Sequence, residues 1–511
     1  MRSKTEPSAG AAVARSAALV AAFFAADKLL GIMREVVVGH AFGMSAELDA
    51  YIAAFEVPEG LNVVVAGAAL TTSLIPLLTA VIAREDREDL WRFVSSVVNW
   101  VLLIVGAAGI GAALFARPVI ATLAPGFDPV QVDLAVRLMR LVLVQTLIFS
   151  ASTVVTGTLQ AHQHFLLPAL GPLFYTAGRI AGAVVLAPQI GIFGLAWGGL
   201  AGSVAHLLVK VPWLVRHRAR WTPVLLHPDL VPLLRLMGPR MLGMGVTYLN
   251  FVLPTTFGSL LAAGAISAYE YAWKLMQLPE TVLGTAMGIV VLPTLAAIAA
   301  RGDRAELRRT FAWTLRLVLA LAIPAAAGLV LLGRPLTALL FQRGAFDAQA
   351  TERVYWALQF FALGLIGHTA LEIVARLFYA RRDMWPPFWA ALAGLATNAA
   401  LGWLLLPTLA HGAIALANSL GACVQVTILL IIAREQIGGI EGTALVRTLL
   451  RTLVATAAMA LAVVGVQMIP GLGAAVGTGL ALSAGGIAYI LVALLVGSEE
   501  IVALPRLFAR R

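Results

Sequence analysis

Charge is scarce in this sequence: only 12% of its 511 residues are Asp, Glu, Lys or Arg, and only four are lysines. With 60% hydrophobic residues and a mean hydropathy of +0.91, a set of soluble domains is excluded. Apolar segments of about 20 residues, long enough to cross a bilayer, recur along the chain. We predict an all-α polytopic membrane protein with about 14 transmembrane helices.

The chain also lacks the motifs of several catalytic classes. Its single cysteine, Cys423, excludes an intrachain disulfide. No lysine follows a glycine, so there is no P-loop, and the eight histidines form no HExxH or Cys/His cluster. We therefore expect a transporter that is not an enzyme and that has no metal or other cofactor. An enzyme that uses charged residues at membrane depth stays open as an alternative.

Basic residues lie at the ends of the apolar segments and form no continuous stripe, which argues against nucleic acid as a partner despite a net charge of +10. If the N-terminus is cytoplasmic, the inner loops collect most of the arginines, among them Arg84, Arg216, Arg301 and Arg434. This asymmetry predicts an even number of spans and cytoplasmic N- and C-termini.

An internal duplication is visible in the sequence. The segment IPLLTAVIAREDREDLWR from Ile75 resembles LPTLAAIAARGDRAELRR, which begins 217 positions later, and three other pairs keep nearly the same offset. We predict an N-terminal lobe (residues 1–218), a C-terminal lobe (219–436) and a two-helix appendage (437–511). Because each repeat has an even number of spans, the two lobes share one orientation, and the cleft between them is the expected transport path.

The first apolar segment carries four charges, which are costly at membrane depth unless they are paired in a protein-lined cavity. They are Asp27, Lys28, Arg34 and Glu35, with Gly31 between them, a residue that permits close approach of a helix or ligand. Seven residues make nearly two helical turns, so Lys28 and Glu35 share one side and Asp27 and Arg34 another. We expect each charge to find partners on other helices, in water or on a ligand.

The second span offers acidic partners for these charges. Asp49, Glu56 and Glu59 lie roughly on one helical face. Pro58 follows closely and is equivalent in the duplication to Pro279, so each proline is expected to kink or break its helix and is a candidate hinge. Charge pairing that only locks helices together is the structural alternative for all of these residues.

In the second repeat, Glu270 and Lys274 are spaced i,i+4 in the favourable order, so we expect a local pair. His368, Glu372 and Arg376 form a stripe that resembles a relay or ion site, although the favoured interpretation is that Glu372 simply pairs with Arg376. Other polar residues within spans are expected to be interhelical hydrogen-bond partners: Arg179, Asn250, Asn398 and Asn418.

Several motifs together resemble the MurJ/MviN-type lipid II flippases, and the similarity covers nearly the whole chain. The segments that carry it are Lys28-Leu-Leu-Gly-Ile-Met-Arg34-Glu35, His40-Ala-Phe-Gly43, Asp49-Ala-Tyr, Leu159-Gln-Ala-His-Gln-His-Phe, Gly191-Ile-Phe-Gly-Leu-Ala-Trp197-Gly, Tyr271-Ala-Trp-Lys-Leu-Met-Gln-Leu-Pro279, Phe341-Gln-Arg-Gly-Ala-Phe346 and Phe378-Tyr-Ala-Arg-Arg-Asp383.

This resemblance implies the fold of the multidrug/oligosaccharidyl-lipid/polysaccharide exporters, in which two six-helix lobes form a V and two further helices shape a lipid groove. It implies a flippase that moves lipid II, an undecaprenyl-pyrophosphate-linked peptidoglycan precursor, from the inner to the outer leaflet of the bacterial cytoplasmic membrane by alternating access. The process served is cell wall biogenesis, and the cell-wall synthesis machinery is a possible partner. Coupling to the membrane potential or to a monovalent ion is left open.

The resemblance also assigns site residues. It implies that Lys28, Arg34 and Lys274 engage the pyrophosphate and that Asp49 matches a functionally important acid. Asn62 stands where members usually carry arginine, and Gly67 stands where an acid is expected. Lysine in place of arginine at the other two positions keeps the charge but loses the bidentate fork that suits phosphate.

These departures leave three alternatives open. The first is a flippase for another polyprenyl-pyrophosphate-linked glycan. The second is a small-molecule exporter on the same scaffold, which predicts a cavity dominated by acids for organic cations. The third is a non-transporting scaffold that binds a lipid intermediate or a cell-wall synthase.

Overall fold

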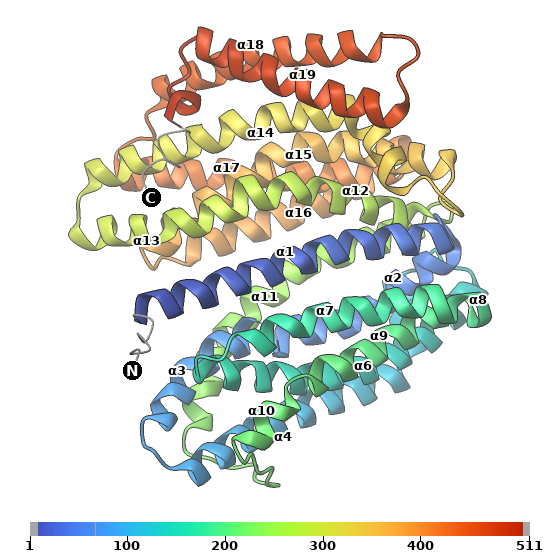
Figure 1. Ribbon diagram of the computed structural model, residues 1–511, viewed down its shortest axis with the longest axis vertical. Helices are drawn as coiled ribbons and strands as arrows, with labels where there is room; N and C mark the ends of the chain where they lie inside the picture. The colour runs from blue at the N-terminus through green and yellow to red at the C-terminus, as the bar shows by residue number, and fades with distance from the viewer. Residues whose placement is uncertain (1–8, 67, 504–511) are drawn as a thin grey trace, which may run out of the picture. The chain divides into compact units, whose positions relative to one another are not determined.

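The computed structural model describes residues 9–66 and 68–503, and every regular element in these ranges is a helix (Figure 1). Eleven helical segments of the described residues are long and apolar enough to cross a membrane. The all-α polytopic class is therefore confirmed, while the count of about 14 spans stays a prediction. By its contacts the chain divides into two units, Met1–Ala263 and Gly264–Arg511.

The first unit contains thirteen labelled helical elements: α1 (Ala9–Phe42), α2 (Ala46–Leu61), η1 (Asn62–Ala66), α3 (Ala68–Ile82), α4 (Arg87–Leu114), α5 (Ala116–Leu123), α6 (Pro129–Ala161), α7 (Leu166–Ala181), η2 (Gly182–Leu186), α8 (Ala187–Ile190), α9 (Ile192–Leu208), α10 (Val211–Arg216) and α11 (Leu230–Ser259). The elements η1 and η2 are short π-helices.

The second unit contains nine: α12 (Ala265–Glu280), the π-helix η3 (Thr281–Thr285), α13 (Ala286–Arg301), α14 (Arg304–Phe341), α15 (Ala348–Ala380), α16 (Trp385–Leu409), α17 (His411–Ile437), α18 (Gly442–Gln467) and α19 (Ala474–Leu495).

Equivalent aspartates begin equivalent helices in the two units. Asp86 caps α4 by accepting hydrogen bonds from the first backbone N–H groups, and Asp303 does the same for α14. Asp128 and Asp347 cap α6 and α15 in the same way. Such caps satisfy N–H groups that have no partner within the helix, so the duplicated sequence fixes the same helix starts twice.

The turns between helices also recur. Gln163 and Arg382, which stand 219 positions apart, have φ values of 57° and 60°. Gly191 and Ala410 share the same offset and have φ values of 60° and 50°. A positive φ is unfavourable for a residue with a side chain. Because these strained turns occur at matching places, the backbone of one repeat is copied in the other.

Both predicted proline irregularities are confirmed. Pro58 lies inside α2, which passes into the π-helix η1 at Asn62, and Pro279 lies inside α12, which passes into η3 at Thr281. A proline removes one backbone hydrogen bond, and π-helical turns of this kind are frequent at functional sites. A hinge motion at these places stays a prediction.

The boundary of the first unit differs from the sequence-based boundary after residue 218. Helix α11 packs against α2, α3, α4, α5 and η1, so the division by contacts falls between Ala263 and Gly264. The duplication shows where the second sequence copy begins, whereas contacts show where the chain packs. Residues 437–511 likewise belong to the second unit, because α18 and α19 lie side by side and pack against α14 (Figure 1).

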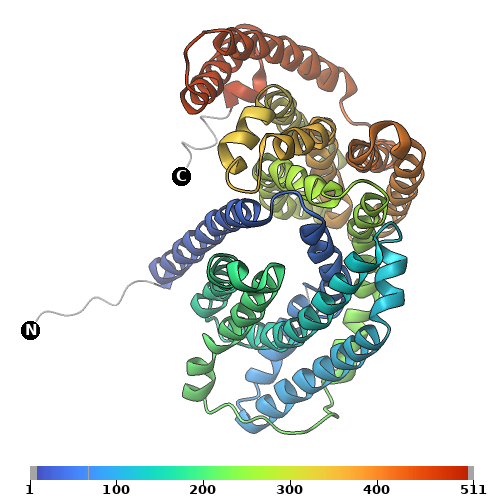
Figure 2. The ribbon, with the colours of Figure 1, turned by 90° about the vertical axis from the view of Figure 1, so that its right-hand side faces the viewer.

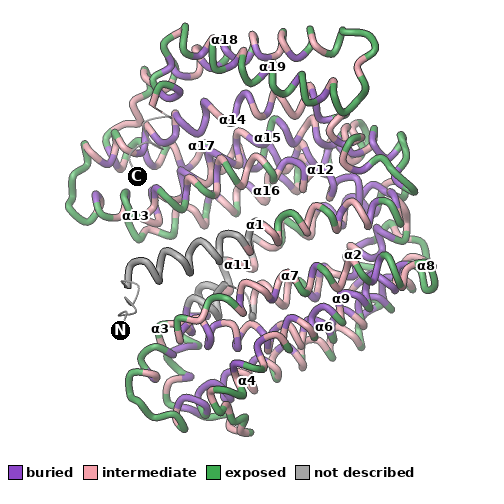
Figure 3. The backbone as a smooth tube through the Cα atoms, in the orientation of Figure 1, coloured by how far each residue is buried: buried purple, intermediate pink, exposed green. Residues whose placement is uncertain are grey.

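Each unit has its own apolar core. In the first unit, Leu74, Phe93 and Leu159 are fully buried in a cluster formed mainly by α3, α4 and α6. In the second, the main cluster joins α13, α14, α15 and α17. Exposed positions follow α18 and α19 along much of their length (Figure 3), and many of them are large and apolar. Helices whose exposed side chains are large and apolar are typical of protein surfaces that face lipid.

Candidate anion-binding site

The charges of α1 begin the candidate site. Arg34 donates hydrogen bonds from Nε and Nη2 to Oε1 of Glu35, at 2.9 and 2.5 Å. We expected these charges to find partners on other helices, so this intrahelical pair corrects the sequence analysis. Both side chains are long enough to bend toward each other around the helix, although their Cβ atoms point in different directions.

Asp27 and Lys28 have different surroundings. Oδ1 of Asp27 accepts a hydrogen bond from the hydroxyl of Thr176 on α7, at 3.4 Å. Lys28 is exposed and makes no hydrogen bond or ion pair with any residue that the structure describes. No described atom lies within 4 Å of the position where Gly31 would carry a Cβ, so space is open beside this part of α1.

The acids of α2 point to different partners. Asp49 is buried in the first turns of the helix. Glu56 accepts a hydrogen bond from the hydroxyl of Thr255 at 2.5 Å, and the Tyr248 hydroxyl donates to its backbone carbonyl at 2.6 Å. Both hydroxyls belong to α11, so Glu56 joins α2 to that helix. Asn62 begins η1, and Gly67 lies outside the described residues.

Arg179 on α7 belongs to the same unit and is a residue that the sequence analysis underrated. Its guanidinium lies over the rings of Tyr51, Phe55 and Tyr175, at 5.7, 5.6 and 5.8 Å from their centroids. Glu59 of α2 lies within its electrostatic range. The expected interhelical hydrogen bond is made with the Tyr51 hydroxyl of α2, and the cation–π contacts add to it. The feature of the sequence that could have identified this residue is an arginine in a mainly apolar span.

In the second unit, the predicted local pair is confirmed. Nζ of Lys274 lies 3.8 Å from Oε2 of Glu270, one turn away on α12. The same ammonium lies 5.5 Å from the centroid of Tyr271. Part of its charge is therefore compensated within its own helix.

The stripe on α15 divides into two separate contacts. Nη2 of Arg376 donates to Oε2 of Glu372 at 2.7 Å, which confirms the favoured pairing. Nε2 of His368 lies 3.0 Å from Oδ1 of Asn418 on α17, so Asn418 is an interhelical partner as expected. A coupling role for Glu372 and Arg376 stays a prediction.

A third lysine, Lys210, is fully buried. Its ammonium donates to the hydroxyl of Ser152 at 2.8 Å, and that hydroxyl lies 2.8 Å from Nδ1 of His206. No ion pair of Lys210 with a described acid occurs. His206 of α9 and Lys210 before α10 are spaced i,i+4, but helical spacing cannot indicate Ser152, which comes from α6.

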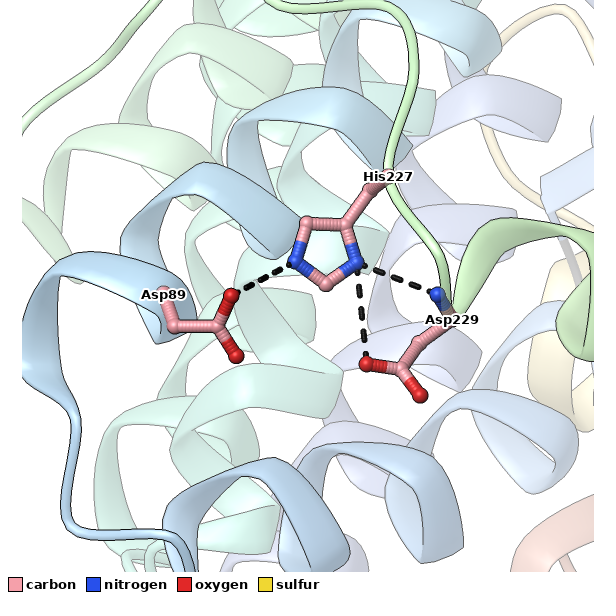
Figure 4. Close-up of side chains that lie close together, drawn as sticks. All are labelled: Asp89, His227 and Asp229. Atoms are coloured by element: carbon pink, nitrogen blue, oxygen red, sulfur yellow. Dashed lines mark hydrogen bonds and ion pairs between the residues drawn. The ribbon is translucent and has the colours of Figure 1, made fainter.

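Asp89, His227 and Asp229 gather where α11 begins (Figure 4). Nε2 of His227 lies 3.1 Å from Oδ1 of Asp89, while Nδ1 accepts the Asp229 backbone N–H at 3.2 Å. One ligand atom from each of the three residues lies within 4.8 Å of the others, a spacing that could hold a metal ion. Arg84 also binds both carboxylates, at 2.8 Å to Asp229 and 3.4 Å to Asp89. The hydrogen bond from Arg84 holds the pKa of Asp229 below its usual range.

The segment between α10 and α11 is fastened along α4 (Figure 2). Nδ2 of Asn99 donates to the backbone carbonyls of Thr222 and Val224, both at 2.9 Å. Trp100 donates to the carbonyl of Leu225 at 2.7 Å. These bonds satisfy backbone groups of an irregular segment, as buried or half-buried carbonyls require.

Three comparisons place this geometry among known proteins. A family model described as lipid II flippase MurJ matches residues 38–495. The lipid II flippase MurJ of Burkholderia cenocepacia is 30% identical over 437 residues, covering 83% of this chain and 84% of the relative. A solved structure of lipid II flippase MurJ in an inward closed conformation matches with a TM-score of 0.80 at 23% identity, covering 96% of this chain and 99% of that chain.

A second solved structure, an inward-facing multidrug resistance transporter of the MATE family, matches with a TM-score of 0.66 at 15% identity over 82% of this chain and 96% of that chain. The helices thus define a polytopic all-α membrane protein with the fold of these two solved structures. Within that class, the chain belongs to the lipid II flippase MurJ family. It is a multi-pass bacterial membrane protein.

Proposed function

We propose that the protein moves lipid II from the inner to the outer leaflet of the cytoplasmic membrane and catalyses no covalent step. One observation carries the proposal: Lys28 and Arg34 lie on α1 and Arg179 lies on α7, and Arg34–Glu35 is the only ion pair that these three cations form with described residues. Cations at membrane depth need an anionic partner, and a diphosphate supplies one.

Lipid II also has a long apolar tail, and the second unit contains a cavity that suits such a chain. The cavity has a volume of about 430 Å³ and is lined by residues of α12, α14, α18 and α19. Its walls include Leu278, Leu336, Met459 and Leu482, so they offer apolar contacts. In this proposal the tail rests against α18 and α19 while the head group crosses.

The direction of transport follows from the distribution of arginines. With both termini cytoplasmic, the inner leaflet is the loading side and alternating access delivers the head group outward. In the second unit, Lys274 is a further candidate cation for the substrate. The membrane potential or a monovalent ion biases the cycle, because moving one charge through 100 mV is worth ~2.3 kcal/mol. Binding to the cell-wall synthesis machinery belongs to the same proposal.

A depletion strain that lacks its own lipid II flippase tests the function. The wild-type chain is expected to restore growth, and a Lys28→Ala/Arg34→Ala/Lys274→Ala variant is expected to fail despite equal insertion in the membrane. If wild type inserts but does not restore growth, lipid II is the wrong substrate in that setting. Full rescue by the triple variant contradicts the diphosphate site.

A flippase for another polyprenyl-pyrophosphate-linked glycan is the second candidate. It is favoured by Asn62, Lys28 and Lys274, which stand where relatives of this family usually carry arginine. Transport assays in vesicles distinguish the two, because only the second candidate predicts faster flipping of a different diphosphate-linked glycan than of lipid II.

A further inference from the structure

Arg179 is a cation whose neighbours are mainly aromatic rings. Tyr51 and Phe55 approach it from α2, and Tyr175 lies one turn earlier on its own helix, α7. No described carboxylate lies close enough to form an ion pair with it. Rings that cover the face of a guanidinium leave the N–H groups at its edge available for hydrogen bonds.

The polar groups of this cluster face one another. The hydroxyl of Tyr51 interacts with the Arg179 guanidinium by a side-chain hydrogen bond, whereas Nε of Arg179 is buried and has no hydrogen-bond partner in the part of the chain that the structure describes. Leaving a buried polar group unsatisfied costs about 1–3 kcal/mol. The guanidinium therefore keeps a donor for a further acceptor.

The cluster is continuous with the α1 cations. Tyr51 lies within electrostatic range of both Arg34 and Arg179. Helix α7 packs against α1 and α9. From α7, the guanidinium of Arg179 reaches the rings of α2. A ligand that bridges Arg34 and Arg179 would lie close to the Tyr51 hydroxyl, which interacts with both arginines.

The face of α2 that meets Arg179 has no cation of its own. At 100° per residue, Tyr51, Phe55, Glu59 and Asn62 fall within an arc of about 80°. Asn62 is uncharged and lies one turn beyond Glu59. Arg179 therefore brings a positive charge to this face from another helix.

We infer that Arg179 is a further substrate-binding residue, which contacts the diphosphate together with Arg34. The inference rests on the function proposed above and deepens it. A diphosphate has several acceptor oxygens and accepts paired N–H bonds from a guanidinium edge. The Tyr51 hydroxyl donates to the same group. Without substrate, the three rings hold the guanidinium in place.

The competing explanation is structural: Arg179 only clamps α7 to α2 through the rings. A variant that places a guanidinium on the same face of α2, but from a different residue, distinguishes the two explanations. An Asn62→Arg substitution in an Arg179→Gln background restores the charge beside Phe55 and Glu59 but does not restore the α7 clamp. Arg137→Gln is the matched control, because Arg137 also lies over a ring, that of Phe193 at 5.5 Å, but on α6.

The experiment uses the full chain in lipid nanodiscs and measures the dissociation constants of undecaprenyl diphosphate and undecaprenyl monophosphate. We expect Arg179→Gln to weaken diphosphate binding about 10- to 100-fold, since hydrogen bonds to charged groups are worth about 1.5–3 kcal/mol. Monophosphate binding should fall less. Arg179→Lys should recover part of the loss, the Asn62→Arg double variant should recover at least tenfold, and Arg137→Gln should match wild type.

Two results overturn the inference alone while wild type still binds the diphosphate. One is binding by Arg179→Gln within twofold of wild type. The other is an equal loss of affinity for both lipids, together with a lower melting temperature, when Asn62→Arg reverses neither change. That result is expected if Arg179 only joins α7 to α2. If wild type itself binds no diphosphate, the proposed function fails, and the inference fails with it.

Discussion

Arg84 and Arg301 occupy equivalent positions in the two sequence repeats, yet they have different partners. Arg84 binds Asp229, 145 residues later, and so ties the end of α3 to the start of α11. Arg301 binds Glu306, five residues later, at 2.8 Å. The same residue thus makes a long-range connection in the first unit and a local one in the second, because only the first unit has a helix from the next sequence copy packed on it.

The cations within the helices of the two units also differ in how fully carboxylates compensate their charge. In the second unit, Lys274 and Arg376 each have a carboxylate one turn away on their own helix. In the first unit, Arg34 is likewise paired with Glu35 on its own helix, but Lys28 and Arg179 form no ion pair with a described residue. Local pairs lower the net charge available to a ligand. The comparison teaches that the first unit is the stronger candidate for holding an anionic head group.

The largest expected effect separates Arg34 from Arg376. We expect Arg34→Ala to abolish rescue of a flippase-depleted strain, because its two N–H donors would serve the diphosphate. Arg376→Ala should retain growth, since its partner Glu372 is half-exposed and can be hydrated. Equal loss in both variants, with equal membrane insertion, would remove the distinction between the units.

The next effect concerns buried and accessible lysines. Ser152→Ala removes the hydroxyl that accepts from Lys210 in the buried cluster. Only the longer contacts of Lys210 with the Ser152 carbonyl and the His206 ring then remain, so the loss should destabilise the protein by about 1–3 kcal/mol. Lys274→Met should lower diphosphate affinity and leave the melting temperature unchanged, because Lys274 is only partly buried. Thermal melting in detergent, with binding measured in parallel, checks both.

A smaller effect is expected from Glu270→Gln. This change leaves Lys274 without its i,i+4 carboxylate, and such pairs are worth about 0.2–0.5 kcal/mol. Affinity for the diphosphate should therefore rise by about twofold at low salt, and the gain should shrink as salt screens the charge. A twofold loss instead would show that Glu270 positions the lysine.

The smallest effect is a pH dependence of the Arg84–Asp229 connection. The pKa of Asp229 is lowered by Arg84, so its contribution to stability is fully present above the ordinary value of about 4 and is lost as the pH falls through the lower folded value. Melting curves of Asp229→Asn should lose this acid sensitivity. Glu306→Gln, which breaks the exposed pair of the second unit, is the control and should leave the curve nearly unchanged.

Local features were predictable from the sequence because they depend on near neighbours. The i,i+4 pair of Glu270 with Lys274 and that of Glu372 with Arg376 follow from helical spacing alone. An irregularity near Pro58 and Pro279 was expected because a proline cannot donate a backbone hydrogen bond, and each helix passes into a π-helix within a few residues of its proline. The Arg34–Glu35 bond was missed, because Cβ direction was taken to fix where long side chains end.

Contacts between distant segments were not predictable. The burial of Lys210 depends on Ser152 from another helix, and the aromatic surroundings of Arg179 depend on two residues of α2. The lobe boundary was placed by sequence copies and not by packing, so α11 was assigned to the second half.

By itself, the sequence determined the membrane class, the duplication and the few charges that must find partners, since hydropathy, repeats and helical spacing are properties of the chain. The tertiary structure decided which of those charges are compensated. Lys274 is paired within its own helix, Lys210 is buried against a hydroxyl, and Arg179 is held by rings with donors to spare. Side chains brought together from several helices set the electrostatics of a site, and only packing specifies which helices meet.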